Sequence, residues 1–300
     1  MAKRVALALS SGGARGLAHI GVIDVLQERG YEITSLAGSS MGAIVGAMYA
    51  AGTLGDYERW IKGLSRMDVI RLVDFTLGAN GFVKGEKIFT EMQKLGFIPD
   101  INIEDLPIPI VILATDIMNN TEVVFTKGKL EEALRASVSI PSVFTPIQKD
   151  DALWVDGGVL NPLPIKHLSK ENADLLVAVD TNALIPFKST RRKKKEKEES
   201  EVDKSTFEQL KERWYELFEG DEKKKLQKVH KLGYLDLMYR TMQVMMNSII
   251  QTTLKEYPPD ILIRLSKDIS GVFEFYRAEE IIETGAEECR NVLDTYENNN

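Results

Sequence analysis

Short apolar runs alternate with longer segments of helical periodicity along most of the chain. Runs of β-branched and other apolar residues predict strands, and apolar residues spaced three or four apart predict helices. The predicted strands are residues 4–9, 32–38, 107–117, 121–128, 173–181 and 260–266. The predicted helices are residues 17–29, 41–52, 129–140, 234–257 and 278–297. This alternation predicts an α/β fold with a parallel sheet that helices cover on both faces.

One segment departs from this pattern. Residues 188–232 are dominated by Lys, Arg, Asp and Glu, and such a composition cannot bury a core of its own. The segment lies between two apolar strands that belong to one predicted sheet. We therefore expect one domain over residues 1–300, with residues 188–232 as a flexible or lid-like insertion.

The segment after this insertion, residues 234–257, has the pattern of an amphipathic helix. Its predicted apolar face is rich in methionine, and its predicted polar face includes Asp236, Arg240, Gln243, Asn247 and Gln251. Packing of the apolar face on the core is one interpretation. An adaptable methionine surface for an apolar ligand is the other.

Composition and charge narrow the choice of partners. The formal net charge of −7 argues against nucleic acid as the main partner. The single cysteine, Cys289, cannot form an internal disulfide, which suits a reducing compartment. No apolar run approaches the roughly 18 residues that span a bilayer. We expect a cytoplasmic protein. A peripheral position at the inner face of the membrane is also compatible with this pattern.

The stretch GSSMGA contains a candidate nucleophile, Ser40. Gly38, Ser40 and Gly42 fit G-x-S-x-G, and a predicted strand precedes them while a predicted helix follows. That context places a serine on a sharp strand-to-helix turn, where its hydroxyl is presented for catalysis. A plain turn without chemistry has the same local pattern.

A glycine-rich loop, SSGGARG at residues 10–16, follows the first predicted strand. Its glycines do not match a dinucleotide fingerprint, and it lacks the lysine of a P-loop. What remains is a loop whose free N–H groups suit an anion, either a phosphate or an oxyanion.

A catalytic serine needs a base, and histidine is a poor candidate in this chain. None of the three histidines, His19, His167 and His230, lies on a loop at a predicted strand end. Asp156 follows an apolar, strand-like ALWV and precedes two glycines, so a turn presents its carboxylate. The same Asp-Gly-Gly is also typical of an ordinary turn.

The three elements together, in this order, resemble the patatin-like phospholipase family. The matching stretches are SGGARGLAHIGVI, GSSMGA and DGG at residues 156–158, with smaller likenesses in GFVKGEKI, ATDI and LRASVSIPSVFTPI. The likeness covers roughly residues 4–182, and the compact bacterial members look most similar. Many relatives carry a third glycine where this chain has Ser11.

The resemblance implies a three-layer α/β/α fold with a mainly parallel central sheet. It also implies a Ser-Asp dyad, with Ser40 as nucleophile and Asp156 as general base. It implies an oxyanion hole from the N–H groups of Gly12, Gly13 and Ala14, with Arg15 close by. The remaining motif glycines are Gly16, Gly38, Gly42, Gly157 and Gly158.

The implied activity is hydrolysis of fatty-acyl esters in phospholipids, lysophospholipids or acylglycerols through an acyl-Ser40 intermediate. The partner expected is a lipid substrate, with transient membrane contact and no nucleic acid. No metal and no cofactor are expected. The alternatives are a non-catalytic lipid-binding or scaffold protein of the same fold and an acyltransferase that uses the same acyl-enzyme.

Overall fold

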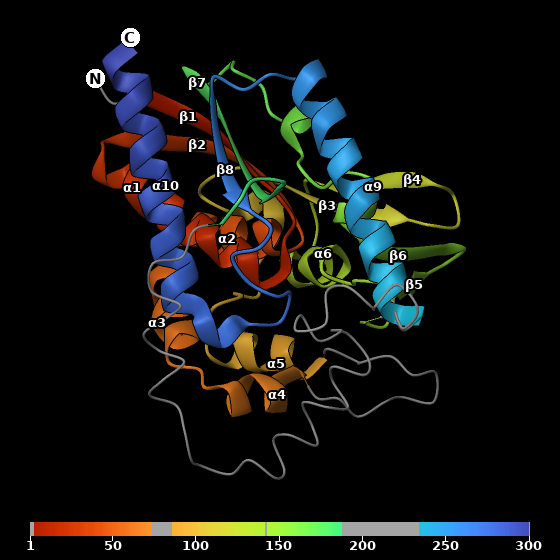
Figure 1. Cartoon of the computed structure of the whole chain (residues 1–300). Coiled ribbons are helices and arrows are strands. Elements are labelled where there is room, and N and C mark those ends of the chain that lie inside the picture. The colour runs from red at the N-terminus through yellow and green to blue at the C-terminus, as the bar shows by residue number, and fades with distance from the viewer. Residues whose placement is uncertain (1–2, 74–85, 142, 188–233, 300) are drawn as a thin grey trace, which may run out of the picture. The chain divides into compact units, whose positions relative to one another are not determined.

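The computed structural model of the chain describes residues 3–73, 86–141, 143–187 and 234–299 (Figure 1). The expected insertion, residues 188–232, lies outside the described residues. The chain divides into two compact units, residues 1–186 with 246–300, and Phe187–Met245. Of the second unit, the structure describes Phe187 and the first part of helix α9 (Tyr234–Glu256). All that follows concerns the first unit.

Within the described residues, eight strands form one mixed sheet in the order β5-β6-β3-β2-β1-β7-β8, with β4 also paired to β3. The five strands β3, β2, β1, β7 and β8 run parallel. Strands β4, β5 and β6 are antiparallel to their neighbours. Because the other five strands are parallel, the expectation of a mainly parallel sheet is confirmed. The strands are β1 Lys3–Leu9, β2 Tyr31–Ser39, β3 Ile110–Asp116, β4 Thr121–Phe125, β5 Ile147–Lys149, β6 Ala152–Asp156, β7 Leu175–Ala183 and β8 Ile261–Ser266.

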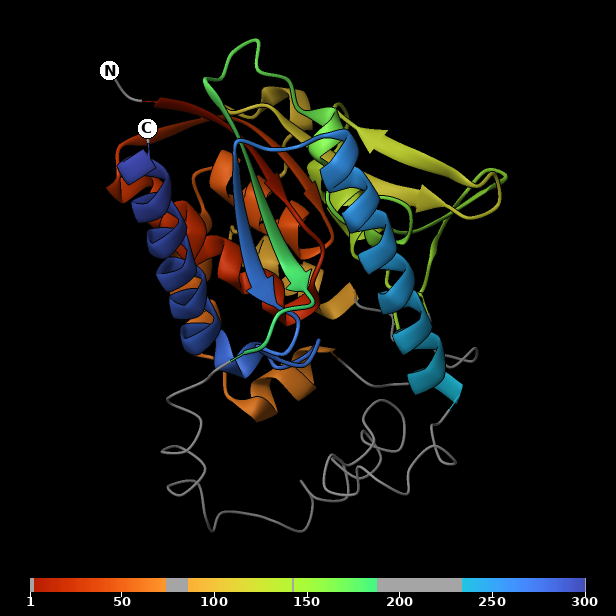
Figure 2. The same cartoon turned by 45° about the horizontal axis from the view of Figure 1, so that its top comes forward.

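Helices cover both faces of the sheet (Figures 1 and 2). Strand order advances in one direction from β1 to β3 and in the other from β7 to β8. Because parallel crossovers are right-handed, α1 and α2 lie on one face and α9 lies on the opposite face. Helix α10 packs along α1. The helices are α1 Ala18–Glu28, α2 Met41–Ala50, α3 Leu54–Lys62, α4 Arg66–Val73, α5 Glu86–Lys94, α6 Leu130–Ser137 and α10 Ala278–Asn299.

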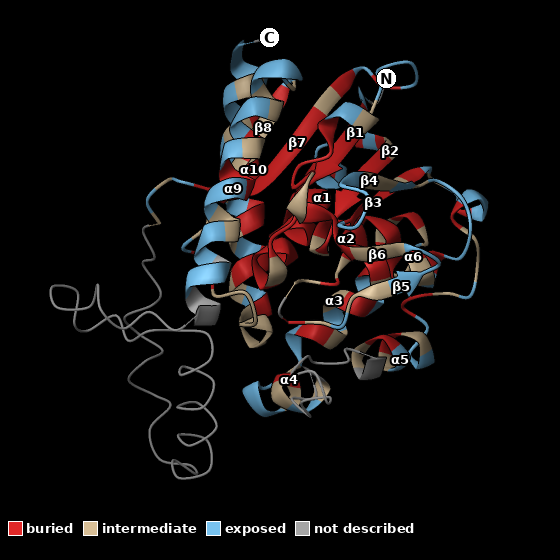
Figure 3. Ribbon diagram, turned by 90° about the vertical axis from the view of Figure 1, so that its right-hand side faces the viewer, coloured by how far each residue is buried: buried red, intermediate tan, exposed pale blue. Residues whose placement is uncertain are grey.

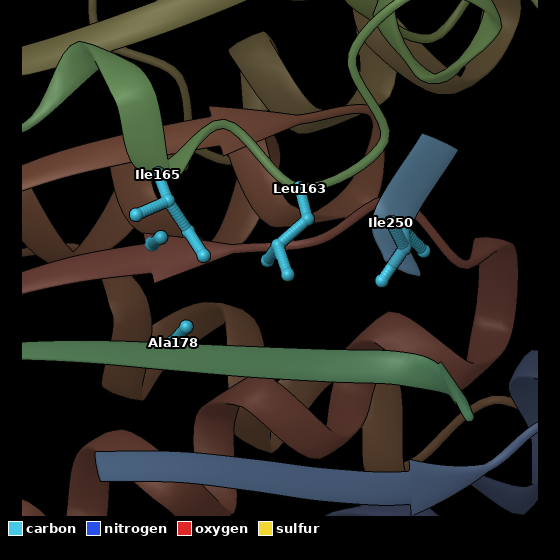
Figure 4. Close-up of a cluster of buried hydrophobic side chains, with 5 residues drawn as sticks. Leu163, Ile165, Ala178 and Ile250 are labelled. Atoms are coloured by element: carbon cyan, nitrogen blue, oxygen red, sulfur yellow. The ribbon is translucent and has the colours of Figure 1, made fainter. Parts of the chain in front are cut away.

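The central parallel strands carry the core. Strands β1, β2 and β7 are buried over most of their length, as Figure 3 shows in red. Helices on both faces leave no solvent-facing side for polar residues, so these strands read as continuous apolar runs. On the α9 face, buried side chains of the segment after β6 meet those of the sheet and of α9 (Figure 4). The residues of this cluster are Ala8, Leu163, Ile165, Ala178 and Ile250.

Helix α9 agrees with the predicted helix in extent and in part with its predicted faces. Met246 and Leu254, both expected on the apolar face, are buried and packed against the core cluster, respectively. Asn247, expected on the polar face, is also buried. The first interpretation, a helix packed on the core, therefore holds for the second half of α9.

The segment that leaves Asp156 is fastened to β4 by a half-buried carboxylate, that of Glu122. His167 Nε2 lies 2.9 Å from Oε2 of Glu122, and Lys166 Nζ donates to Oε1 at 2.6 Å. Partial burial by itself would raise the pKa of Glu122. Hydrogen bonds from His167, Lys166 and Asn161 outweigh it and lower the pKa to about 2.

Glu122→Gln should lower the free energy of unfolding by roughly 1–3 kcal/mol at neutral pH. A carboxyl with a lowered folded-state pKa stabilises the fold above its unfolded pKa of 4.5, and this contribution is lost as the pH falls towards about 2. Urea unfolding of the wild type and of Glu122→Gln should therefore show a smaller gap between their free energies of unfolding at pH ~3.5 than at pH ~7. A gap of equal size at both pH values would contradict this. Glu132→Gln, which removes an exposed pair with Lys149, is the matched control.

Candidate active site

Strand pairing at β3 brings two strand ends together. Between residues 112 and 116, one edge of β3 is occupied by β4. The other edge is shared by β2, which pairs with residues 110–113, and by β6, which pairs with residues 114–116. Ser39 lies opposite Leu113, and Asp156 lies opposite Ala114. Strands β2 and β6 therefore meet end to end, and the residues at their ends become neighbours.

Ser40 lies at this meeting point, on a sharp turn between β2 and α2. It caps α2 with φ of 55° and ψ of −124°, a conformation that non-glycine residues rarely adopt. A side chain at Gly42 would collide with the carbonyl oxygen of Leu9, so only glycine lets α2 begin this close to β1. The elbow expected from G-x-S-x-G is thus present as geometry.

The hydroxyl of Ser40 donates to Oδ2 of Asp156 at 2.5 Å. Both residues are almost completely buried, with 4% of Ser40 and 6% of Asp156 exposed. The second oxygen of the carboxylate, Oδ1, accepts the N–H of Gly158 at 2.7 Å. A side chain at Gly157 would collide with the carbonyl oxygen of Leu113, so glycine is required for the turn to approach β3.

Burial sets the basicity of Asp156. Loss of hydration raises the pKa of its carboxyl, while hydrogen bonds from Ser40 and Gly158 lower it, and the outcome is a pKa of about 6. Near neutral pH the group is mostly a carboxylate, yet it holds a proton far better than an exposed aspartate. An aspartate in this state can take the proton of the hydroxyl that it contacts.

The glycine-rich loop, residues 10–16, is braced from the end of β7. Thr181 Oγ1 and Asn182 Nδ2 both donate to the carbonyl oxygen of Ser11, at 2.9 Å and 2.6 Å. Because a peptide group is planar and trans, fixing this carbonyl also fixes the direction of the Gly12 N–H.

Two members of the expected oxyanion hole are engaged elsewhere. The N–H of Ala14 donates to the carbonyl oxygen of Val272 at 2.8 Å. The guanidinium of Arg15, 4% exposed, donates to the carbonyl oxygens of Thr181 and Ser270 and to Oδ1 of Asn182. Arg15 therefore ties the loop to the end of β7 and to the segment that follows β8.

Within the described residues, no histidine hydrogen-bonds to Ser40 or Asp156. His19 is fully buried, and its Nε2 donates to the carbonyl oxygen of Ser10 at 2.8 Å. Burial lowers the pKa of His19 to about 4, although the hydrogen bond to Ser10 acts in the opposite direction. His167 is held by Glu122, and His230 lies outside the described residues.

An apolar pocket adjoins Ser40. Its empty volume, including the open solvent at its mouth, is about 790 Å³. The pocket was not predicted from the sequence, because α3, α4 and α5, which form much of its wall, belong to none of the predicted elements. The only signal was the apolar spacing in residues 54–94, which is equally typical of core helices. Besides Ser40, Gly13 and Met41, the lining residues are Ile44, Tyr57, Ile61, Leu64, Val69, Leu72, Ile88, Phe89, Met92, Val138, Ile140, Phe144, Val272, Phe273 and Phe275.

Comparison with known proteins assigns the family. The model of the family described as patatin-like phospholipase matches residues 7–169, which include the glycine-rich loop, Ser40 and Asp156. The chain belongs to the patatin-like phospholipase family. This membership confirms the resemblance seen in the three motifs and places the chain among lipid acyl hydrolases.

The relatives differ in how much of their own length they share with this chain. An uncharacterized NTE family protein of Mycobacterium tuberculosis is 34% identical, over 98% of this chain and 92% of its own. A lysophospholipase of Meyerozyma guilliermondii is 31% identical over 60% of this chain, which corresponds to 13% of that protein. VipD from Legionella pneumophila superimposes over 98% of this chain and 67% of its own, with a TM-score of 0.56 and 16% identity. That superposition supports the fold alone.

Two further findings concern the described residues. In the part of the chain that the structure describes, no cluster of His, Cys, Asp or Glu has the arrangement of a metal site. None of the described helices is both long enough and apolar enough to pass through a bilayer.

Proposed function

We propose that this protein is a serine hydrolase that cleaves the acyl ester of a lipid through an acyl-Ser40 intermediate. The observation that carries the proposal is the 2.5 Å contact between Ser40 Oγ and Asp156 Oδ2, at the side of an apolar pocket. The candidate substrates are phospholipids, lysophospholipids and acylglycerols, since each carries a fatty-acyl ester on a polar headgroup or on glycerol.

The reaction begins when Asp156 removes the proton of Ser40 and Ser40 Oγ bonds to the ester carbonyl carbon. The carbonyl oxygen becomes an oxyanion. When the carbonyl re-forms, the bond to the leaving alcohol breaks, and the alcohol takes the proton that Asp156 holds. A water molecule then repeats the sequence: it gives a proton to Asp156, attacks the acyl carbon and returns Ser40 to its free form.

We assign the oxyanion hole to the N–H groups of Gly12 and Gly13. Ala14, expected in this role, already has Val272 as acceptor, and Arg15 braces the loop with its side chain. Gly13 also lines the pocket beside Ser40, which suits a donor that faces the reacting carbonyl. Donors of this kind stabilise charge that arises only in the transition state, and each is typically worth ~10²–10³ in rate.

The pocket supports a hydrocarbon chain as the part of the substrate that it holds. Its wall consists almost entirely of aliphatic and aromatic side chains, so a charged headgroup inside it would lose its hydration without compensation. The acyl chain would lie in the pocket while the alcohol part of the ester remains outside. A substrate of this class lies in membranes or micelles, so transient contact with such a surface follows from the proposal.

The test combines an active-site probe with a lipid panel. An alkyl phosphonate probe should label wild-type protein at Ser40, located by peptide mass spectrometry. The same protein should release free fatty acid from at least one of phosphatidylcholine, lysophosphatidylcholine and diacylglycerol. If the probe labels Ser40 but no fatty acid is released in any buffer, transfer of the acyl group to another alcohol is favoured. An added acceptor alcohol would reveal that transfer. Neither labelling nor release would support the non-catalytic alternative and overturn the proposal.

A further inference from the structure

One short segment touches both members of the Ser40–Asp156 pair. Ser137 is the last residue of α6, and its Oγ accepts the backbone N–H of Ser40 at 2.9 Å. Two residues later, the carbonyl oxygen of Ser139 accepts the backbone N–H of Asp156 at 2.9 Å. Ser137 and Ser139 are both fully buried. The two residues that must react with each other are therefore hydrogen-bonded to the same three-residue stretch.

We propose that Ser137 is a positioning residue, which holds the backbone of Ser40 so that its hydroxyl meets Asp156. The inference rests on the proposed function, because it assigns a part in that reaction. Among the described residues, Ser137 neither lines the pocket nor hydrogen-bonds to the carboxylate of Asp156, so its action passes through Ser40.

The backbone of Ser40 needs such a partner for two reasons. At the start of α2, the N–H of Ser40 has no acceptor within the helix, and a buried N–H without an acceptor is costly. In addition, φ of 55° with ψ of −124° persists at a serine only when neighbouring groups fix it from several sides. From the α2 side, the carbonyl oxygen of Ser40 accepts from Ala43 and Ile44. Ser137 supplies the acceptor on the other side of the residue.

The neighbouring Ser139 separates the two kinds of contact. Its carbonyl holds Asp156, but its hydroxyl points back into α6, donating to the carbonyl oxygen of Arg135 and accepting from the Arg135 guanidinium. Ser139→Ala therefore removes a buried hydroxyl from the same segment. It leaves in place the bond from the Ser40 N–H to Ser137 Oγ and the bond from the Asp156 N–H to the Ser139 carbonyl oxygen. It is the matched control for any change at Ser137.

The decisive comparison is Ser137→Thr against Ser137→Val. Threonine and valine have nearly the same shape, but only threonine offers an oxygen to the N–H of Ser40. With a soluble p-nitrophenyl ester, we expect Ser137→Val to lower kcat ~10–100-fold with KM changed less than about 2-fold, because a displaced nucleophile slows the chemical step. Ser137→Thr should keep most of the wild-type kcat, and Ser139→Ala should keep nearly all of it.

The pH profile gives a readout that a merely structural role would not move. The hydrogen bond from Ser40 lowers the pKa of Asp156 and thereby offsets part of the effect of burial. If Ser137→Val displaces Ser40, the acid limb of kcat/KM should shift to higher pH than in wild type, whereas Ser137→Thr and Ser139→Ala should leave it unchanged. Melting temperatures of all variants, measured alongside, show whether each is folded at the assay temperature.

Three outcomes overturn the inference. A folded Ser137→Val variant with wild-type kcat and an unshifted acid limb overturns it while the proposed function stands. Equal damage in Ser137→Val and Ser137→Thr, with both folded, also overturns it, since the oxygen would then be irrelevant. A wild-type protein that neither labels with an alkyl phosphonate nor hydrolyses any ester overturns the proposed function itself, and this inference with it.

Discussion

Replacing Ser40 by alanine should reduce ester hydrolysis by at least ~10³-fold while the protein remains folded. The substitution removes one oxygen atom and nothing else, so the acyl-enzyme cannot form although the pocket is intact. Ser40 supplies the only side-chain oxygen that contacts the Asp156 carboxylate among the described residues. Hydrolysis of a p-nitrophenyl ester and labelling by an alkyl phosphonate are the two measurements, and both should be lost together.

Ser39→Ala is the control for this variant. Ser39 precedes the nucleophile, is fully buried, and its Oγ has no hydrogen-bond partner. Its loss should leave labelling and hydrolysis close to wild type. Residual activity of Ser40→Ala above one-tenth of wild type would exclude Ser40 as the nucleophile.

Replacing Asp156 by asparagine should be nearly as damaging, and it should also make the protein more stable at neutral pH. Asparagine has a similar shape but cannot accept the proton of Ser40, so kcat should fall by about 10²–10⁴-fold. Replacing His19 or His167 by glutamine should leave most of the chemistry, because neither contacts the dyad. A histidine variant as inactive as Ser40→Ala would indicate a triad instead.

The stability gain follows from the raised pKa of Asp156. A carboxyl that burial raises from 3.8 to about 6 favours the folded state at low pH, and this contribution is lost as the pH rises through about 6. Above that pH the folded protein carries an unfavourable buried charge, which asparagine removes. The free energy of unfolding of Asp156→Asn should exceed that of wild type by roughly 1–3 kcal/mol at pH ~8. The difference should disappear below pH ~4, and a variant less stable than wild type at pH ~8 would contradict the assigned cause.

The same pKa predicts that wild-type kcat/KM declines as the pH falls below about 6, because Asp156 must be a carboxylate to act as base. The contribution of a second, partly buried acid needs to be separated from that of Asp156. Burial also raises the pKa of Asp24 on α1 to about 6. Asp24→Asn should therefore retain both the activity and the acid limb, while Asp156→Asn removes the activity to which that limb belongs.

Sequence patterns predicted the central strands and the first two crossovers because buried parallel strands are continuously apolar and their loops carry diagnostic glycines. Ser40 and Asp156 were candidates for the same reason, since each ends a predicted strand. Their contact was not predictable from those patterns alone. It depends on β2 and β6 sharing one edge of β3, and strand register between segments more than a hundred residues apart leaves no local signal.

Other features were missed because they depend on which hydrogen bonds remain free after folding. The N–H of Ala14 looks equivalent to those of Gly12 and Gly13 in the sequence, but the carbonyl of Val272 reaches it from a segment more than 250 residues later. The apolar pocket likewise depends on how α3, α4 and α5 pack. Asn247 of α9 was assigned to the wrong face because it is buried, contrary to the ordinary preference of its side chain.

The position of a buried carboxylate beside an apolar pocket would also affect how turnover ends. Hydrolysis through Ser40 would leave the new fatty acid with its carboxyl group beside Asp156, and two neighbouring carboxylates of like charge repel each other in a medium of low polarity. Above pH ~6 the base that activates Ser40 would thus expel the product. Below pH ~6, a proton shared between the carboxyl groups of Asp156 and the fatty acid would retain the product. Product inhibition is therefore expected below pH ~6 and rapid release above it.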